Sequence, residues 1–101
     1  MDDIQKIKEK ILSVLLPFGF RKIALFGSFA RGEAGPTSDI DLLVELKPYN
    51  QRKPLGLQWF GLEQKLGKLL GRKVELVNEP NLSPYIRPYV EKDLLTLYEE
   101  R

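Results

Sequence analysis

Hydrophobic residues recur every three or four positions in two long segments of the chain. In residues 3–16, isoleucine and leucine return at the spacing of a helix with one buried face. Residues 55–70 repeat this pattern, so a second helix is predicted there. The side chains expected on its buried stripe are Leu55, Trp59, Leu62, Leu66 and Leu69.

Residues that start or stop helices stand at the ends of both segments. Asp2 or Asp3 is placed to accept hydrogen bonds from the free amides at the start of the first helix. Pro17 and Gly19 follow its last apolar residues and are expected to end it. Gly71 has the same position after the second helix, because glycine readily adopts the left-handed conformation that terminates a helix.

Shorter apolar runs lie between and after these helices. Residues 21–26, 39–46 and 72–78 are predicted to be strands, and residues 85–91 a short helix. Residues 94–98 fit either a last short strand or a continuation of that helix, and the strand is favoured. Strands that alternate with helices indicate an α/β or α+β domain, with helices packed against a small mixed sheet of three to four strands.

Polar segments connect the predicted elements. Residues 28–33 are expected to form a turn or the first turns of a helix, and a glycine–proline pair marks residues 34–38 as a loop. Residues 47–54 are polar and contain two prolines, so this segment is expected to be mobile. No repeat or internal boundary interrupts the pattern, and residues 1–101 are expected to form one domain.

Composition narrows the chemistry that the chain can support. The 101 residues, 43% of them hydrophobic, include no cysteine and no histidine. Catalysis must therefore rest on carboxylates, hydroxyls, Lys, Arg, Tyr or a hard metal ion. The net charge of +2 comes without a basic stripe, so nucleic acid is not an expected partner. The acidic start does not resemble a signal peptide and no apolar run is long enough to span a membrane, which favours the cytoplasm.

Asp39 and Asp41 interrupt the apolar run of the second predicted strand. Side chains two residues apart point to the same face of a strand, so these carboxylates project together. Adjacent carboxylates repel each other unless one is protonated or a cation lies between them. Mg²⁺ binds one or two carboxylates together with waters and substrate phosphates, which makes this pair a candidate half of a metal site. The alternative is a turn cap at Asp39 and a surface ion pair between Asp41 and a lysine.

A candidate phosphate-binding segment precedes the aspartates. Gly27 lets the backbone approach a ligand closely, and Ser28 offers a hydroxyl and, if a helix begins there, a free amide. Arg31 lies on the same turn and has a planar guanidinium that suits phosphate. Taken one at a time, these residues fit an ordinary strand-ending turn and a solvated arginine. Their combination at this spacing favours phosphate binding, although the glycine-rich P-loop pattern is absent.

The stretch over residues 27–44, GSFARGEAGPTSDIDLLV, resembles the signature of the nucleotidyltransferase superfamily related to DNA polymerase beta. That signature is Gly-Ser, then about ten residues, then Asp-x-Asp. The small size of the chain, with Ala-Arg-Gly after the Gly-Ser, is similar to the minimal nucleotidyltransferases, called MNT. The resemblance covers nearly the whole chain, because the flanking helices and the third strand fall where that family has them, and it implies a nucleotidyltransferase fold.

The resemblance also implies a third carboxylate on the next strand, where this chain has Glu75. Aspartate is the more usual residue there in the family. Glutamate is longer by one methylene group, which would shift the metal geometry or weaken a base. The alternative for Glu75 is a salt bridge to Lys22 or Lys73.

The reaction that the resemblance implies is transfer of a nucleoside monophosphate, AMP from ATP, to a hydroxyl group, with pyrophosphate leaving. The cofactor would be Mg²⁺, at one or two sites. The residues implied to hold the nucleotide phosphates are Gly27, Ser28 and Arg31. The residues implied to bind metal and to catalyse the reaction are Asp39, Asp41 and Glu75.

Partners follow from the resemblance alone. Minimal nucleotidyltransferases of prokaryotes are typically antitoxins encoded beside a HEPN-domain toxin, which implies a tyrosine of such a toxin as the acceptor. One alternative is an antitoxin with a weak or inactive site that neutralises a toxin by binding alone. Another is a nucleotidyltransferase that acts on RNA or a small molecule. Assembly into a homo-oligomer also stays open.

A second side of the 55–70 segment carries the residues Gly56, Phe60, Gly67 and Gly71. Glycine inside a helix costs about 1 kcal/mol relative to alanine, so these positions are expected to admit another backbone closely. That backbone belongs either to a partner or to the first helix of this chain. The four tyrosines are expected to be half-buried packing residues rather than catalysts.

Overall fold

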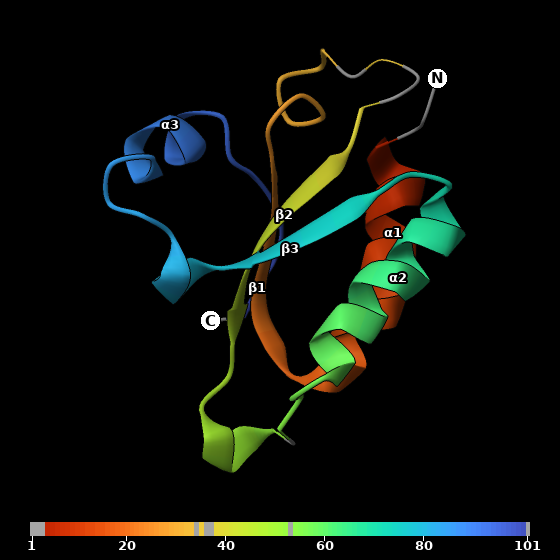
Figure 1. Cartoon of the computed structure of the whole chain (residues 1–101), viewed down its shortest axis with the longest axis vertical. Helices are drawn as coiled ribbons and strands as arrows, with labels where there is room; N and C mark the ends of the chain where they lie inside the picture. Colours follow the sequence, from red (N-terminus) through yellow and green to blue (C-terminus); the bar gives the residue numbers. More distant parts are fainter. Residues whose placement is uncertain (1–3, 34, 36–37, 53, 101) are drawn as a thin grey trace.

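The computed structural model describes residues 4–33, 35, 38–52 and 54–100. Its helices and strands are α1 (Ile4–Leu15), β1 (Phe20–Phe26), β2 (Ile40–Leu46), α2 (Gln58–Leu70), β3 (Val74–Asn78), α3 (Arg87–Lys92) and β4 (Leu95–Glu99). They form a sheet of order β3-β2-β1-β4, shown in Figure 1. β2 and β3 run parallel, whereas β1 is antiparallel to both of its neighbours. The predicted mixed sheet is confirmed.

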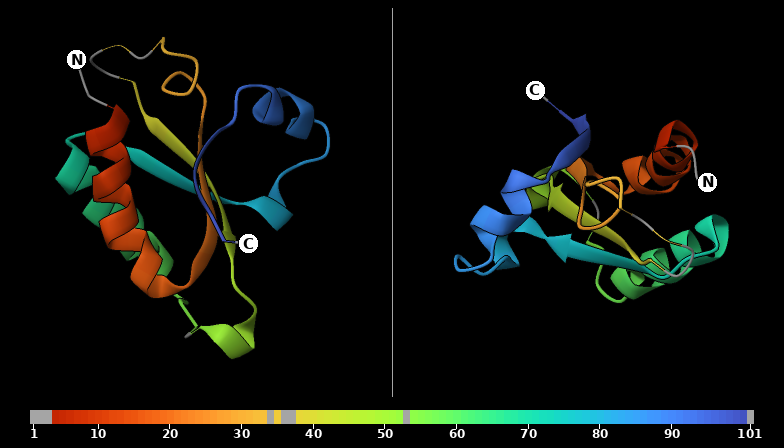
Figure 2. Two further views of the ribbon diagram at one scale, coloured as in Figure 1. Left: turned by 180° about the vertical axis from the view of Figure 1, so that it is seen from behind. Right: turned by 90° about the horizontal axis from the view of Figure 1, so that it is seen from above.

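Helices α1 and α2 lie side by side on one face of the sheet, and α3 lies on the other side (Figure 2). The core fills the space between the sheet and these two helices. Its most deeply buried side chains include Ile11, Leu15, Ile23, Leu25, Ile40, Leu42, Val44 and Leu66. None of the helices in the described ranges is long and apolar enough to cross a membrane.

Alternation along β2 decides which of its side chains leave this core. Ile40, Leu42 and Val44 belong to the cluster beneath the two helices. Because successive side chains of a strand point to opposite faces, Asp41 projects from the sheet face that α1 and α2 do not cover. The apolar pattern thereby places a carboxylate on the accessible face of a central strand.

Both long helices occur where the sequence predicts them, with two differences. The second begins at Gln58 rather than at residue 55, although Leu55 is still buried in the turn that precedes it. Leu69, predicted to be buried, is 43% exposed, and Leu70 packs against the core instead. Both residues lie one turn after Leu66, so helical spacing alone does not distinguish them.

Both helix ends follow the predicted glycine chemistry. Gly19 ends a short 3₁₀ turn after α1 with φ of 86°, and Gly71 ends α2 with φ of 69°. In each case the glycine amide donates to a carbonyl of the preceding turn, at Leu16 and Gly67 respectively. The cap expected from Asp2 or Asp3 lies outside the described residues.

The C-terminal segment confirms the favoured strand, because β4 pairs with β1. The segment after Lys47 contains a 3₁₀ turn over Tyr49–Gln51, and most of it is described. The expected half-burial of the tyrosines is wrong at two positions. Tyr85 and Tyr89, which flank the start of α3, are 86% and 75% exposed.

Candidate functional site

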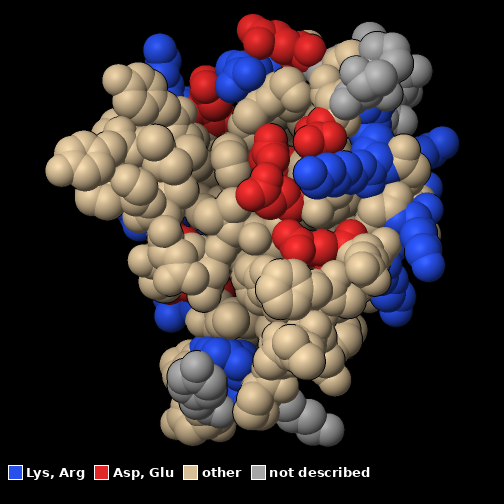
Figure 3. Space-filling view, in the orientation of Figure 1, with Lys and Arg blue, Asp and Glu red and all other residues tan. Residues whose placement is uncertain are grey.

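Asp41 and Glu75 stand directly opposite each other on the parallel strands β2 and β3. Asp39 precedes β2 and is exposed, as is Glu75, whereas Asp41 is half-buried. A pocket of about 370 Å³ adjoins the pair; it is lined by Phe26, Asp41, Glu75, Val77, Asn81, Leu82, Ser83 and Ile86. In Figure 3, acidic side chains gather near the middle of this view, between basic side chains over α2 and an uncharged bulge over α3.

Burial and neighbouring negative charges both disfavour the charged form of the Asp41 carboxylate. Burial raises the pKa of Asp41, and the nearby negative charges of Glu75 and then Asp39 raise it further. Within the described ranges, none of these three carboxylates forms an ion pair. The surface ion pair considered for Asp41 is therefore not formed. Lys22 contacts Glu79 at 3.9 Å instead of Glu75.

The donor set fits a hard divalent cation. Across the described part of the chain, no three acidic side chains are already gathered as a metal cluster. Asp39 and Glu75 are exposed, however, so their side chains can turn toward Asp41 without disturbing the core. Carboxylate oxygens are the ligands that Mg²⁺ prefers, and a cation would remove the repulsion that raises the pKa of Asp41.

The turn after β1 brings backbone amides next to this pair. Residues 27–32 form a turn in which the Arg31 amide donates to the Gly27 carbonyl at 3.1 Å. The buried side chain of Phe29 anchors the turn in the core. No backbone hydrogen bond from the amides of residues 28–30 is found within the described ranges, which is the arrangement of a helix start. Such amides suit an anionic ligand.

Position 27 requires glycine because of its backbone conformation and because the Asp41 side chain lies close to it. Its φ is 76°, and a Cβ atom added there would lie 2.7 Å from Oδ2 of Asp41. The backbone of the turn therefore lies directly against the half-buried carboxylate. The sequence predicted that Gly27 lets the backbone approach a ligand closely, and that stays a prediction. In the structure the group beside Gly27 is the Asp41 carboxylate.

Replacing Gly27 with alanine is expected to lower activity more than stability. The left-handed conformation costs a residue with a Cβ about 1–2 kcal/mol, and the methyl group forces the Asp41 carboxylate to move. We expect a modest drop in the unfolding midpoint in urea and at least a tenfold loss of the nucleotide transfer that the sequence resemblance implies. Gly32→Ala is the matched control, because Gly32 has φ of 73° but nothing lies within 4 Å of its added Cβ. Equal loss of transfer in both variants would contradict a specific role of Gly27.

Arg31 does not point at a phosphate site in this structure. Its guanidinium contacts Glu33 at 3.0 Å and Asp93, beyond α3, at 3.6 Å. The hydrogen bond with Glu33 raises the pKa of Arg31. The phosphate-binding role of Arg31 stays a prediction that requires this side chain to leave at least one carboxylate.

Two residues that hold the site in place were missed by sequence reasoning. Arg72 donates to the carbonyls of Gly35 at 2.8 Å and Ser38 at 3.0 Å, and its guanidinium lies 4.7 Å from the ring centroid of Phe29. It thus connects the segment before Asp39 to the turn over residues 27–32. Glu63 of α2 accepts a hydrogen bond from the amide next to Glu75, that of Leu76, at 2.8 Å.

The second side of the 55–70 segment, which carries Gly56, Phe60, Gly67 and Gly71, does not pack against α1 at its glycines. A Cβ added at Gly56 or Gly71 would meet nothing within 4 Å, and one added at Gly67 would approach the Arg72 carbonyl. Phe60 on the same side is 59% exposed. Of the two alternatives for this surface, packing against the chain's own first helix is wrong at these glycines.

Comparisons with known proteins identify the family of this chain. A family model described as a nucleotidyltransferase domain matches residues 4–97. A protein of Methanocaldococcus jannaschii is 42% identical over 94 residues, which cover 92% of this chain and 90% of that protein. Protein adenylyltransferase MntA of Thermococcus cleftensis is 38% identical over 78 residues, 77% of this chain and 75% of that protein.

Solved structures share the fold over most of the chain. A toxin–antitoxin complex with AMP-PNP superposes with a TM-score of 0.77 and 26% identity, covering 93% of this chain and 74% of that one. A complex of the tri-AMPylated HEPN toxin of Shewanella oneidensis with MNT antitoxin superposes with a TM-score of 0.71 and 25% identity. The match covers 94% of this chain and 71% of that one. This chain is therefore a member of the nucleotidyltransferase domain family, with the fold of a minimal nucleotidyltransferase.

Proposed function

We propose that this chain is an antitoxin that transfers AMP from ATP to a tyrosine hydroxyl of a HEPN-domain toxin. The observation that carries the chemistry is the register of β2 and β3, which places Asp41 opposite Glu75 with the backbone of Gly27 against Asp41. Phosphoryl-group transfer depends mainly on positioning and charge neutralisation. This arrangement would position the nucleotide and hold the cations that neutralise its charge. The choice of acceptor is supported by the neighbouring complex that contains an AMPylated HEPN toxin and an MNT antitoxin.

Each residue has a defined task in this proposal. The amides of the 27–32 turn and the Ser28 hydroxyl bind the β- and γ-phosphates. Asp39 and Asp41 would hold Mg²⁺, and Asp41 and Glu75 a second ion, which when bound neutralises phosphate charge and lowers the pKa of the acceptor hydroxyl. Glu75, exposed at the rim of the 370 Å³ pocket, accepts the hydroxyl proton. The hydroxyl oxygen bonds to the α-phosphorus as the bond to the bridging oxygen breaks, and pyrophosphate leaves.

Transfer of label from α-labelled ATP tests the proposal. Incubation of this chain with Mg²⁺, the labelled ATP and a HEPN-domain toxin that forms a complex with it is expected to label the toxin. Changing the acceptor tyrosine to phenylalanine should abolish the label, because the attacking oxygen is lost. The measurement is label on the toxin after denaturing gel separation, with unlabelled ATP as competitor.

The outcome also separates the alternatives for this chain. A stable complex without label on the toxin would identify a docking antitoxin and overturn the enzymatic proposal. Label on RNA in place of the toxin would overturn the choice of a protein acceptor. Nucleic-acid binding would in addition weaken steeply with salt, since it depends on counterion release.

A further inference from the structure

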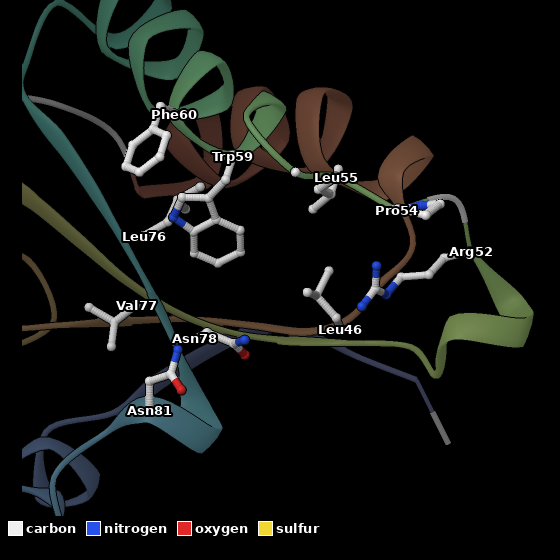
Figure 4. A pocket seen from close by; sticks show the side chains of 11 residues that line it. Leu46, Arg52, Pro54, Leu55, Trp59, Phe60, Leu76, Val77, Asn78 and Asn81 are labelled. Atoms are coloured by element: carbon white, nitrogen blue, oxygen red, sulfur yellow. The ribbon is translucent and has the colours of Figure 1, made fainter.

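A second pocket opens at the free edge of β3, beneath the start of α2. Its volume of about 700 Å³ is in the usual range for a site that holds a small molecule. In Figure 4 the side chain of Trp59 points from α2 toward the strands. Phe60 lies beside Trp59, and Asn78 lies on the opposite side of the pocket. Val77 and Asn81 form one end of the pocket, and Arg52 lies at the other.

This pocket and the one that adjoins the candidate catalytic carboxylates lie on opposite faces of β3 and meet at its free edge. Val77 and Asn81 line both pockets. Val77 follows Glu75 by two residues, which is about 7 Å along a strand. In a nucleotide the base lies one ribose away from the α-phosphate. A nucleotide with its α-phosphate beside Asp41 and Glu75 reaches this second pocket with its base if it bends around the free edge of β3, where Val77 and Asn81 lie.

The lining of the pocket has the chemistry of a nucleobase site. Trp59 and Phe60 offer aromatic faces, on which any base can stack. Asn78 and Asn81 offer side-chain amides, which can donate and accept at the same time. Oδ1 of Asn78 is buried and receives no hydrogen bond within the described residues. An asparagine amide matches the N6 and N7 edge of adenine in particular.

Trp59 is held in position before any ligand arrives. Its ring packs against Phe20 at a centroid distance of 6.1 Å, and it adjoins the main core. Phe60 is more than half exposed, so its ring can move onto a bound base. The pocket thus has one aromatic side chain in a fixed position, Trp59, and one that is free to reorient, Phe60.

We propose that this pocket binds the base of the nucleotide, with Trp59 and Phe60 as stacking surfaces and the amides of Asn78 and Asn81 selecting adenine. This inference rests on the proposed function, because it assumes a nucleoside triphosphate at the carboxylates. It adds the location of the base and the reason for a preference among bases.

Trp59 is the single tryptophan of the chain, so intrinsic fluorescence reports on this pocket directly. The experiment compares ATP with inorganic tripolyphosphate, which has the phosphates but no base, in the presence of Mg²⁺ and without an acceptor. We expect ATP to quench Trp59 as it saturates the site. Tripolyphosphate should bind, as seen by calorimetry, and leave the emission unchanged. UTP should bind about fivefold more weakly than ATP, because uracil stacks less and lacks the adenine edge.

A pair of matched variants separates stacking from general effects on α2. Phe60→Ala and Leu57→Ala each remove a large exposed apolar side chain near the start of this helix, but only Phe60 lines the pocket. We expect Phe60→Ala to weaken ATP about fivefold or more by calorimetry and to leave tripolyphosphate unaffected. Leu57→Ala should change neither. Both variants should unfold at the same urea concentration as the unaltered chain.

The results distinguish failure of the base site from failure of the proposed nucleotide transfer. If ATP binds without altering Trp59 emission, or if tripolyphosphate quenches equally, the base lies elsewhere and the proposed transfer still stands. Equal ATP affinity in the Phe60→Ala and Leu57→Ala variants would also overturn the base site. If neither ATP nor tripolyphosphate binds, both the base site and the nucleotidyltransferase proposal fail.

Discussion

Neutralising both aspartates, by Asp39→Asn with Asp41→Asn, should abolish Mg²⁺-dependent ATP binding and nucleotide transfer while the fold persists. The two side chains would hold the cation that neutralises phosphate charge, a contribution of several kcal/mol to the transition state. Loss of this stabilisation of the transition state corresponds to a rate loss on the order of 10³-fold or more. The measurements are calorimetric titration of ATP with Mg²⁺ and label transfer to the toxin.

The same variant should be more stable than the unaltered chain when metal is absent. Burial, Glu75 and Asp39 raise the pKa of Asp41, so the folded state disfavours the charged carboxylate. The folded chain then retains a proton over a pH range in which the unfolded chain has lost it. Stability that depends on this proton is complete below the ordinary pKa of 3.8 and declines as pH rises through the raised pKa. Asparagine does not titrate, so it avoids this loss.

Unfolding in urea with EDTA at several pH values measures this effect. The stability gained by the double variant should be near zero at acid pH and largest at neutral pH. Adding Mg²⁺ with ATP should stabilise the unaltered chain by mass action and leave the variant unchanged. The control is Glu9→Gln with Glu99→Gln, which removes the same charge from exposed positions on α1 and β4. A double aspartate variant that still transfers nucleotide would refute the roles assigned to both residues.

The part of the site that sequence predicted is the part set by local rules. Strand alternation alone put Ile40 and Leu42 in the core and Asp41 on the opposite face. Glycine chemistry located the ends of the two long helices and the turn at Gly27. These features depend on residues within a few positions of each other, so they can be read from one segment at a time.

The part that sequence did not predict depends on contacts between distant segments. Arg72 reaches the carbonyls of Gly35 and Ser38, which lie 37 and 34 residues earlier in the chain. Glu63 covers the amide of Leu76 across 13 residues. Surface arginines and glutamates are common, and no local pattern marks those that hold a loop or a strand edge. Only the packing of α2 and β3 against the sheet reveals them.

Glu75→Gln should reduce nucleotide transfer by about 10²- to 10⁴-fold while ATP binding is largely retained. Glutamine keeps the size of the side chain but cannot accept the acceptor's proton, and loss of a general base costs a factor of this order. Glu75 is exposed and forms no ion pair within the described residues, so the stability of the fold should change by about 0.5 kcal/mol or less. Single-turnover label transfer, with ATP affinity measured separately, resolves the two steps.

The Glu75→Asp variant tests whether nucleotide transfer depends on the extra methylene group that glutamate has relative to aspartate. Aspartate shortens the side chain but keeps the charge opposite Asp41, on a strand whose position is fixed by its register with β2. If Glu75 accepts the proton or shares a cation with Asp41, the aspartate variant should transfer nucleotide far better than the glutamine variant. Glu99→Gln serves as the control for loss of one exposed carboxylate. Because the fold is expected to survive all three changes, equal activity in the Glu75→Gln variant and the unaltered chain would mean that Asp39 and Asp41 act without a third carboxylate.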